Sequence, residues 1–161
     1  MQKLNYQLLT STLIKMKKIL FVVVLGLTTF FYANAQEIGV RFGDIASGNN
    51  VALDGVFKTS KFSRIHADIS FGHGIGIDAL WDFAYRPLGG EAFNWYAGVG
   101  PYIRIDDPFN LGVAGELGLE YRFKGVPIAL GLDWRPGLNI IETTDFHAGG
   151  FGFNARFVFG K

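Results

Sequence analysis

Residues 64–71 have the sequence RIHADISF, in which every second residue is apolar. The same alternation recurs in residues 76–85 (GIDALWDFAY), 111–122 (LGVAGELGLEYR) and 126–135 (VPIALGLDWR). Because successive side chains of a β-strand point to opposite faces, a period of two predicts strands with one apolar and one polar face. No stretch after residue 36 has helical periodicity, so the sequence predicts an all-β protein.

Turn-forming residues divide the chain after residue 36 into eight runs, which are 37–44, 50–58, 61–72, 75–86, 93–104, 110–122, 125–135 and 149–160. Most runs are near the length of about 9–11 residues that crosses a bilayer as a tilted strand. Bacterial single-chain membrane barrels have an even number of strands. We therefore predict an eight-stranded antiparallel transmembrane β-barrel, an up-and-down meander whose longest loop is 136–148.

The first 35 residues have the features of an export signal. Residues 16–18 are MKK, residues 19–31 are an apolar run, and ANA at 33–35 is a small-x-small cleavage site. This order is typical of a secretory signal peptide. We expect 16–35 to be the signal, with cleavage near Ala35, and 36–161 to be the mature barrel. Residues 1–15 precede a better start at Met16, and the choice between Met1 and Met16 stays open.

The composition of the mature chain excludes several kinds of protein. Four of the 15 Lys and Arg residues precede residue 36, which leaves 11 basic and 14 acidic residues and a net charge of −3. There is no basic surplus to attract nucleic acid, so no such partner is expected. The absence of cysteine excludes disulfides, thiolate nucleophiles, cysteine zinc sites and a lipid-modified N-terminal cysteine.

Volume and charge predict which face of the strands points inward. The apolar face carries many large aromatic residues, which would overfill the lumen of an eight-stranded barrel. The polar face carries glycines and charges, so we predict that it lines the lumen. Seven basic residues there oppose seven acidic ones, as paired buried charges require. The predicted lumen charge network is Arg41, Asp54, Lys58, Arg64, His66, Asp68, Asp78, Asp82, Arg104, Glu116, Glu120, Arg122, Asp133, Arg135 and Arg156.

Aromatic residues of the apolar face gather near the predicted strand ends, as they do in the interfacial girdles of membrane barrels. The predicted lipid-facing girdle residues are Phe57, Phe62, Tyr85, Trp95, Tyr121 and Phe159 at the periplasmic rim and Trp134 at the other rim.

In this pattern the chain resembles the small eight-stranded outer-membrane barrels of Gram-negative bacteria, of the OmpX and OmpA-transmembrane kind. The closing stretch 151–159, FGFNARFVF, is similar to the aromatic last strand that the outer-membrane assembly machinery recognises, although Gly160 and Lys161 follow it. The resemblance implies a location in the cell outer membrane and contact with its lipid. It also implies an assembly signal at Phe153, Phe157 and Phe159.

No arrangement of residues predicts catalysis, a cofactor or a metal site. His66 and Ser70 share a face but lie roughly 13 Å apart along a strand, too far for a base and a nucleophile. His147 shares its predicted loop with Glu142, Thr143, Thr144 and Asp145, without metal-ligand spacing.

A lumen filled by charge pairs does not conduct. We therefore predict a structural or surface-interaction role, with the loop 136–148 as the contact for a surface partner. Two alternatives stay open, which are a secreted soluble β-barrel that binds an apolar ligand and a lipid A-modifying outer-membrane enzyme.

Overall fold

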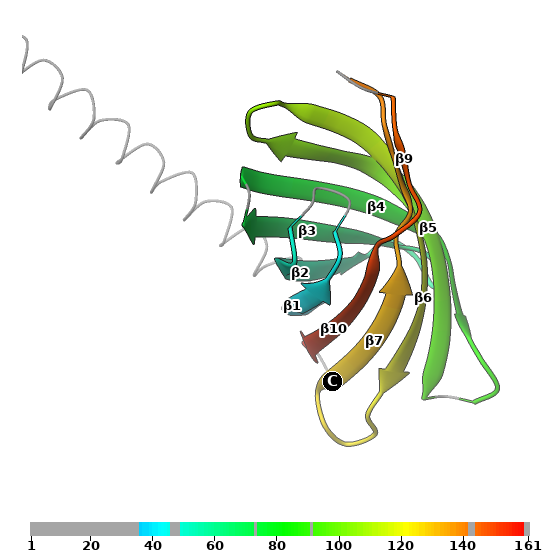
Figure 1. Cartoon of the computed structure of the whole chain (residues 1–161). Helices are drawn as coiled ribbons and strands as arrows, with labels where there is room; N and C mark the ends of the chain where they lie inside the picture. The colour runs from blue at the N-terminus through cyan, green and yellow to red at the C-terminus, as the bar shows by residue number, and fades with distance from the viewer. Residues whose placement is uncertain (1–35, 46–48, 73, 91, 142–143, 160–161) are drawn as a thin grey trace, which may run out of the picture. The chain divides into compact units, whose positions relative to one another are not determined.

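The computed structural model describes residues 36–45, 49–72, 74–90, 92–141 and 144–159. The predicted signal peptide lies outside the described residues. Among those residues there are ten β-strands and no helix (Figure 1). The strands are β1 (Glu37–Gly43), β2 (Val51–Lys58), β3 (Arg64–Gly72), β4 (Gly74–Pro87), β5 (Phe93–Ile105), β6 (Asn110–Arg122), β7 (Ile128–Trp134), β8 (Gly137–Asn139), β9 (Phe146–His147) and β10 (Phe151–Val158).

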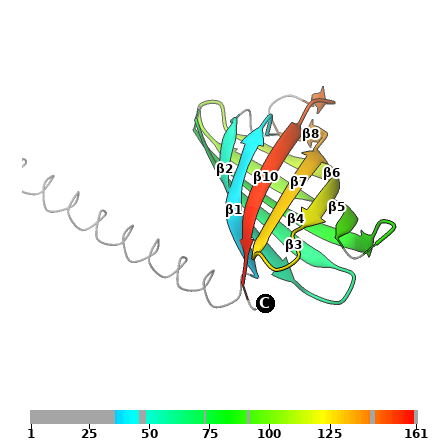
Figure 2. The ribbon, with the colours of Figure 1, turned by 90° about the horizontal axis from the view of Figure 1, so that it is seen from below.

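Eight of these strands form a closed antiparallel barrel. Neighbours in sequence pair from β1 to β7, β7 pairs with β10, and β10 pairs with β1, which closes the ring. Figure 2 shows β2, β1, β10 and β7 side by side across this closure. The predicted all-β fold with eight strands in meander order is confirmed, and the predicted strand ends differ from the observed ones by at most three residues.

The segment 136–148, predicted as the longest loop, lies in the longest connection between barrel strands, and it contains a short hairpin of β8 and β9 that was not predicted. β8 pairs with β6 in the register that β7 has already set, and the Gly115 N–H donates to the Pro136 carbonyl at 2.8 Å. Pro136 has no N–H of its own, so it interrupts a ladder that resumes beyond it. The hairpin therefore extends the β6 side of the barrel at the end opposite the termini (Figure 1).

A β-bulge in β4 reverses the direction of its side chains. The pairing of β4 with β5 shifts register between Asp82 and Ala84. Asp82 before the bulge is buried, but after it Tyr85 lies opposite the buried Tyr96. A bulge inserts one residue and so exchanges the two faces of the strand beyond it. For that reason Tyr85 points into the barrel, and its prediction as a lipid-facing residue was wrong.

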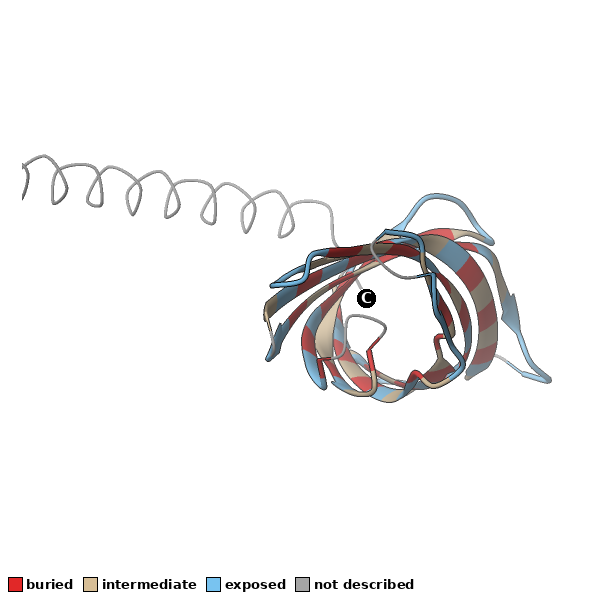
Figure 3. Cartoon of the chain, turned by 45° about the horizontal axis from the view of Figure 1, so that its top comes forward, coloured by how far each residue is buried: buried red, intermediate tan, exposed pale blue. Residues whose placement is uncertain are grey.

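Buried and exposed residues alternate along the barrel strands, as the stripes in Figure 3 show. The inner face is crowded where glycine stands beside a larger side chain. A Cβ added at Gly118 would lie 2.1 Å from the ring of Tyr96, and one added at Gly131 would lie 2.4 Å from Asn154 Oδ1. Glycine at these positions makes room for large polar side chains from the neighbouring strands.

Candidate functional site: the charged lumen

The inner face of the barrel gathers ionisable side chains from strands all round the ring. The buried ones number eight carboxylates, four guanidinium groups and one imidazole among the described residues. A charge removed from water is stable only when it is paired and hydrogen-bonded. The carboxylates are those of Glu37, Asp54, Asp68, Asp78, Asp82, Glu116, Glu120 and Asp133, and the basic groups are those of Arg41, Arg64, Arg135, Arg156 and His66.

Arg135 holds the centre of this network. It follows β7 at the interruption of the ladder, and its side chain is 1% exposed. Its guanidinium lies 2.7 Å from Glu116 Oε1, donates to Asp68 and lies 3.9 Å from Asp78. One arginine thus links carboxylates of β3, β4 and β6 across the barrel.

Arg41 connects β1 to Asp133, near the end of β7. Its Nε donates to Asp133 Oδ1 at 2.9 Å, and its other nitrogens donate to the carbonyls of Asp44 and Gly150 at 3.1 Å and 3.0 Å. The second Asp133 oxygen accepts from Asn154 Nδ2 at 2.9 Å. These bonds tie together the strands on both sides of the closure.

Glu120 organises the end of the lumen that lies near the termini. Arg64 Nη1 lies 2.8 Å from its Oε2, Arg122 Nε lies 2.7 Å from its Oε1, and Arg156 donates to it as well. The Tyr85 hydroxyl donates to Glu120 at 2.8 Å and accepts from Arg122 at 2.8 Å. Arg64, Tyr85 and Arg122 are among the residues that line a recess of about 350 Å³ at this end.

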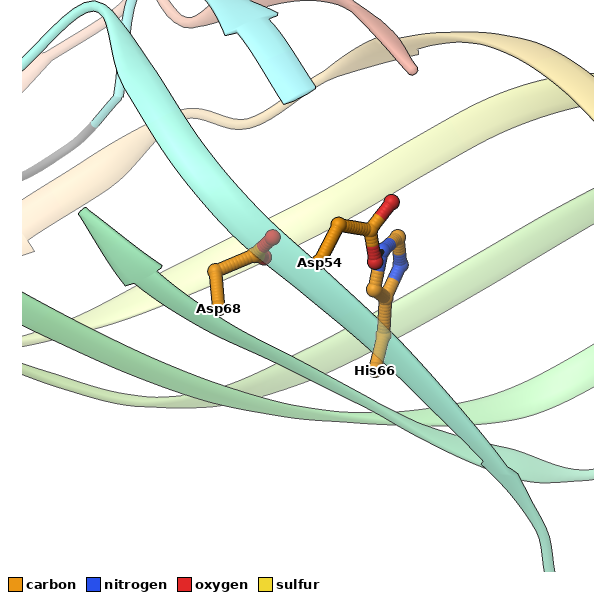
Figure 4. Close-up of side chains that lie close together, drawn as sticks. All are labelled: Asp54, His66 and Asp68. Atoms are coloured by element: carbon orange, nitrogen blue, oxygen red, sulfur yellow. Dashed lines mark hydrogen bonds and ion pairs between the residues drawn. The ribbon is translucent and has the colours of Figure 1, made fainter. Parts of the chain in front are cut away.

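His66 lies between two carboxylates in the middle of the lumen. Its Nε2 is 2.7 Å from Asp54 Oδ1 and its Nδ1 is 3.1 Å from Glu116. Asp54, His66 and Asp68 come from the neighbouring strands β2 and β3, and each has a ligand-type atom within 4.8 Å of the others (Figure 4).

These side chains could offer oxygen and nitrogen ligands to a metal ion, but basic groups already lie among them. Arg135 Nη2 lies 3.1 Å from His66 Nε2, and Arg156 Nη1 lies 3.4 Å from the same nitrogen. Arg156 also contacts Asp54 at 3.2 Å. Two guanidinium groups therefore neutralise the carboxylates, and the arrangement is that of an ion-pair cluster.

Sequence reasoning missed one charged member of the network and misjudged the balance of charge. Glu37 is 3% exposed and accepts from Arg156 Nε at 3.0 Å and from Arg122. Glu37 lies on the same face of β1 as Arg41, which follows four residues later, so the alternation already indicated that Glu37 points into the lumen. Lys58, counted as a lumen cation, is exposed at the end of β2, while Arg104 and Arg122 are half-buried. The predicted equality of seven and seven was wrong, because the lumen holds more carboxylates than guanidinium groups.

Uncharged polar side chains complete the lumen and were not predicted. Tyr96 is fully buried, and its hydroxyl accepts from Asn154 at 3.4 Å. Tyr102 donates to Asn139 and so links β5 to β8. Both tyrosines alternate with residues of the apolar face, and this alternation was the sequence signal for their inward position. An aromatic ring does not by itself distinguish a lipid-facing position from a buried one.

The other predicted girdle residues lie near strand ends or, for Phe62, in the turn between β2 and β3. Phe57, Trp95, Tyr121 and Phe159 are half-buried, and Phe62 is 36% exposed. At the opposite end, Trp134 Nε1 donates to the Ala148 carbonyl at 2.8 Å, and its ring stacks on Phe151. Of the predicted assembly signal, Phe153 and Phe157 are exposed on β10, and Phe159 packs against Phe157 just beyond its end.

The residues considered for catalysis or metal binding have other partners. Ser70 accepts from Asn49 Nδ2 at 3.1 Å, whereas His66 contacts the carboxylates described above. His147 Nε2 lies 2.9 Å from Asp44 Oδ2 at the surface. In the same segment Thr144 and Asp145 are exposed, and Glu142 and Thr143 lie outside the described residues.

Comparison with known proteins identified no relative of the chain. No family model matches the chain, and no curated protein or solved structure matches it. Within the described ranges, no helix is long and apolar enough to span a membrane. The function must therefore be inferred from the chemistry of the two faces of the barrel.

Proposed function

We propose that the mature chain is a small integral outer-membrane β-barrel protein of the OmpX and OmpA-transmembrane kind, with a structural or surface-interaction role. The observation that carries this proposal is the reversed distribution of its side chains. Arg41 and Arg156 are 0% and 2% exposed, whereas Leu132 is 62% and Phe151 is 71% exposed. All eight barrel strands contribute exposed large apolar residues to the outer wall.

This distribution fits a lipid environment. Soluble proteins place aliphatic and aromatic side chains inside and seldom bury arginine or aspartate. A continuous apolar wall round a barrel is an unusually large exposed patch for a monomer in water, and such patches mark contact with a membrane or another protein. In a bilayer the same wall has no cost, and the closed ring leaves no unpaired strand edge in the hydrocarbon.

The lumen argues against the two alternative functions. A soluble barrel that carries an apolar ligand needs an apolar interior, but the buried apolar cluster of the described residues contains only Leu80, Tyr102 and Ala114. A lipid-modifying enzyme needs an activated nucleophile beside a base. The exposed His147 has a carboxylate partner, Asp44, and none of its hydrogen bonds within the described residues is to a hydroxyl group. The proposal is therefore a non-enzymatic barrel whose paired charges fill the lumen and prevent conduction.

Two partners follow from this proposal. The exposed aromatic strand β10 is the surface offered to the outer-membrane assembly machinery. The hairpin of β8 and β9 is the contact for a surface partner, because it extends the barrel wall away from the termini and exposes Leu138 and Phe146 by 41% and 63%.

Cell fractionation with a gel-mobility assay tests the proposal. The protein should stay in the outer-membrane pellet after a carbonate wash and should migrate differently in cold and boiled detergent samples, because a closed membrane barrel resists cold detergent. Release by carbonate into the soluble fraction would contradict the proposal and would favour the secreted soluble barrel.

A further inference from the structure

Among the described residues, the exposed charges at the two ends of the barrel differ in sign. At the end that bears the termini, the exposed ionisable side chains of the described residues are those of Lys58, Lys61, Arg86 and Lys124, while Glu91, in the turn between β4 and β5, lies outside the described residues. At the opposite end the exposed aspartates are Asp106, Asp107 and Asp145. The described part of the end near the termini therefore offers four exposed cations to an anionic ligand.

The bulge in β4 directs one of the basic residues to the outer wall. Without the extra residue, Tyr85 would point outward and Arg86 inward. With it, Arg86 lies outside, directly opposite Trp95 of β5. Phe83, three residues earlier, is 51% exposed on the same wall. Arg86 therefore lies at the edge of the apolar outer wall, next to the turn between β4 and β5.

A second basic residue reaches the same place from the turn between β2 and β3. The Tyr85 N–H donates to the Phe62 carbonyl at 2.9 Å, which fixes this turn against the end of β4. The Arg86 guanidinium carbon lies 3.9 Å from the centroid of the Phe62 ring, and Lys61 Nζ lies 5.1 Å from the same centroid. Both cations contact one ring, and neither forms an ion pair with a carboxylate of the described residues.

We infer that Lys61, Phe62, Arg86 and Trp95 form a binding site for the phosphate group of an anionic phospholipid in the leaflet near the termini. This inference rests on the proposed membrane location. Arginine and lysine side chains bind phosphate through charge-assisted hydrogen bonds, and guanidinium does so with two parallel donors. Stacking on Phe62 holds the guanidinium in place at the surface, and Trp95 supplies the interfacial ring beside it.

The site would be selective for a net negative headgroup. A zwitterionic headgroup brings its own ammonium group beside the phosphate, and that group would meet two cations. A basic residue near an anionic lipid surface contributes about fivefold to binding, so two residues at one headgroup should give a measurable preference.

Quenching of Trp95 by lipids with brominated acyl chains measures this preference. The protein carries W81F and W134F, which leaves Trp95 as the reporter, and is refolded into mixed vesicles of phosphatidylglycerol and phosphatidylcholine. Brominating one lipid at a time gives their relative affinity near Trp95. We expect a preference for phosphatidylglycerol that K61Q/R86Q lowers about fivefold or more. The matched control K58Q/K124Q removes the same charge at the same end and should change the preference less than about twofold.

The outcomes separate the site from the membrane location itself. A folded barrel with no preference for phosphatidylglycerol would overturn the lipid site, as would an equal loss in K61Q/R86Q and K58Q/K124Q, because general attraction would then explain it. Failure of the unaltered protein to enter any vesicle in a heat-modifiable form would instead overturn the proposed function. Should K61Q/R86Q not fold, K61Q and R86Q are measured singly, and each should lower the preference.

Discussion

Neighbouring residues of β6 occupy opposite environments on the inner and outer walls of the barrel. Glu116 and Glu120 are 4% and 0% exposed, whereas Leu117 and Leu119 between them are 51% and 48% exposed. In water, burial of the glutamates and exposure of the leucines would both be unfavourable. Hydrogen-bonded charge pairs, rather than an apolar core, therefore hold the inside of the barrel together, and in the proposed membrane location lipid would cover its outer wall.

The inner wall should be the more sensitive one to loss of a charge. Glu116→Ala breaks two buried ion pairs at once, those with Arg135 and with His66, which should lower the free energy of unfolding by about 3–5 kcal/mol. The matched control is Asp107→Ala, an exposed carboxylate whose loss should change it by less than about 0.5 kcal/mol. Urea titrations in detergent measure both, and equal midpoints would mean that Glu116 faces water.

The outer wall should be sensitive to the gain of a charge. Leu132→Arg, near the middle of β7, should destabilise the barrel in a bilayer by about 2–4 kcal/mol. Leu88→Arg is the control, since Leu88 is similarly exposed but lies in the turn after β4. Folding yield in lipid vesicles is the measurement. If Leu132→Arg folds as well as Leu88→Arg, the outer wall does not contact hydrocarbon.

The bulge can be tested through the tyrosine that it moves from one wall to the other. Tyr85→Phe removes a hydroxyl bonded to Glu120 and Arg122 and should cost about 1.5–3 kcal/mol, because hydrogen bonds to charged groups are strong. Tyr121→Phe is the control on the outer wall, where the ring packs against Phe93 and Phe123. Its loss should be within about 0.5 kcal/mol. A larger loss of stability in Tyr121→Phe than in Tyr85→Phe would mean that Tyr85 points outward, as simple alternation predicts.

The smallest effect is expected where a charge pair meets water. His147 and Asp44 form a surface pair with exposed fractions of 48% and 44% for their side chains. His147→Ala should change the free energy of unfolding by about 0–1 kcal/mol, since exposed pairs contribute little. The same urea titration applies. A loss as large as that of Glu116→Ala would show that the hairpin of β8 and β9 is held to the barrel mainly by this contact.

Local pattern was sufficient for most of the fold. The alternation over residues 64–71 and its repeats predicts the eight strands, because the period of two is a property of each strand alone. The turn residues between the runs set the strand ends to within three residues. The same alternation separates Arg41, Asp54 and Glu116 from the apolar face, so much of the lumen could be named before the structure.

Only the tertiary structure decided which charges meet and where the alternation fails. Arg135 contacts Asp68, 67 residues earlier, because strand register brings them together, and register depends on pairing between distant segments. The bulge that turns Tyr85 inward and Arg86 outward, and the ladder that resumes at β8 beyond Pro136, likewise depend on the neighbouring strand. The sequence by itself determined a barrel with one charged and one apolar face, since side-chain period is local. Closure of the ring determined the ion pairs, since contacts across the lumen join residues that are far apart in the sequence.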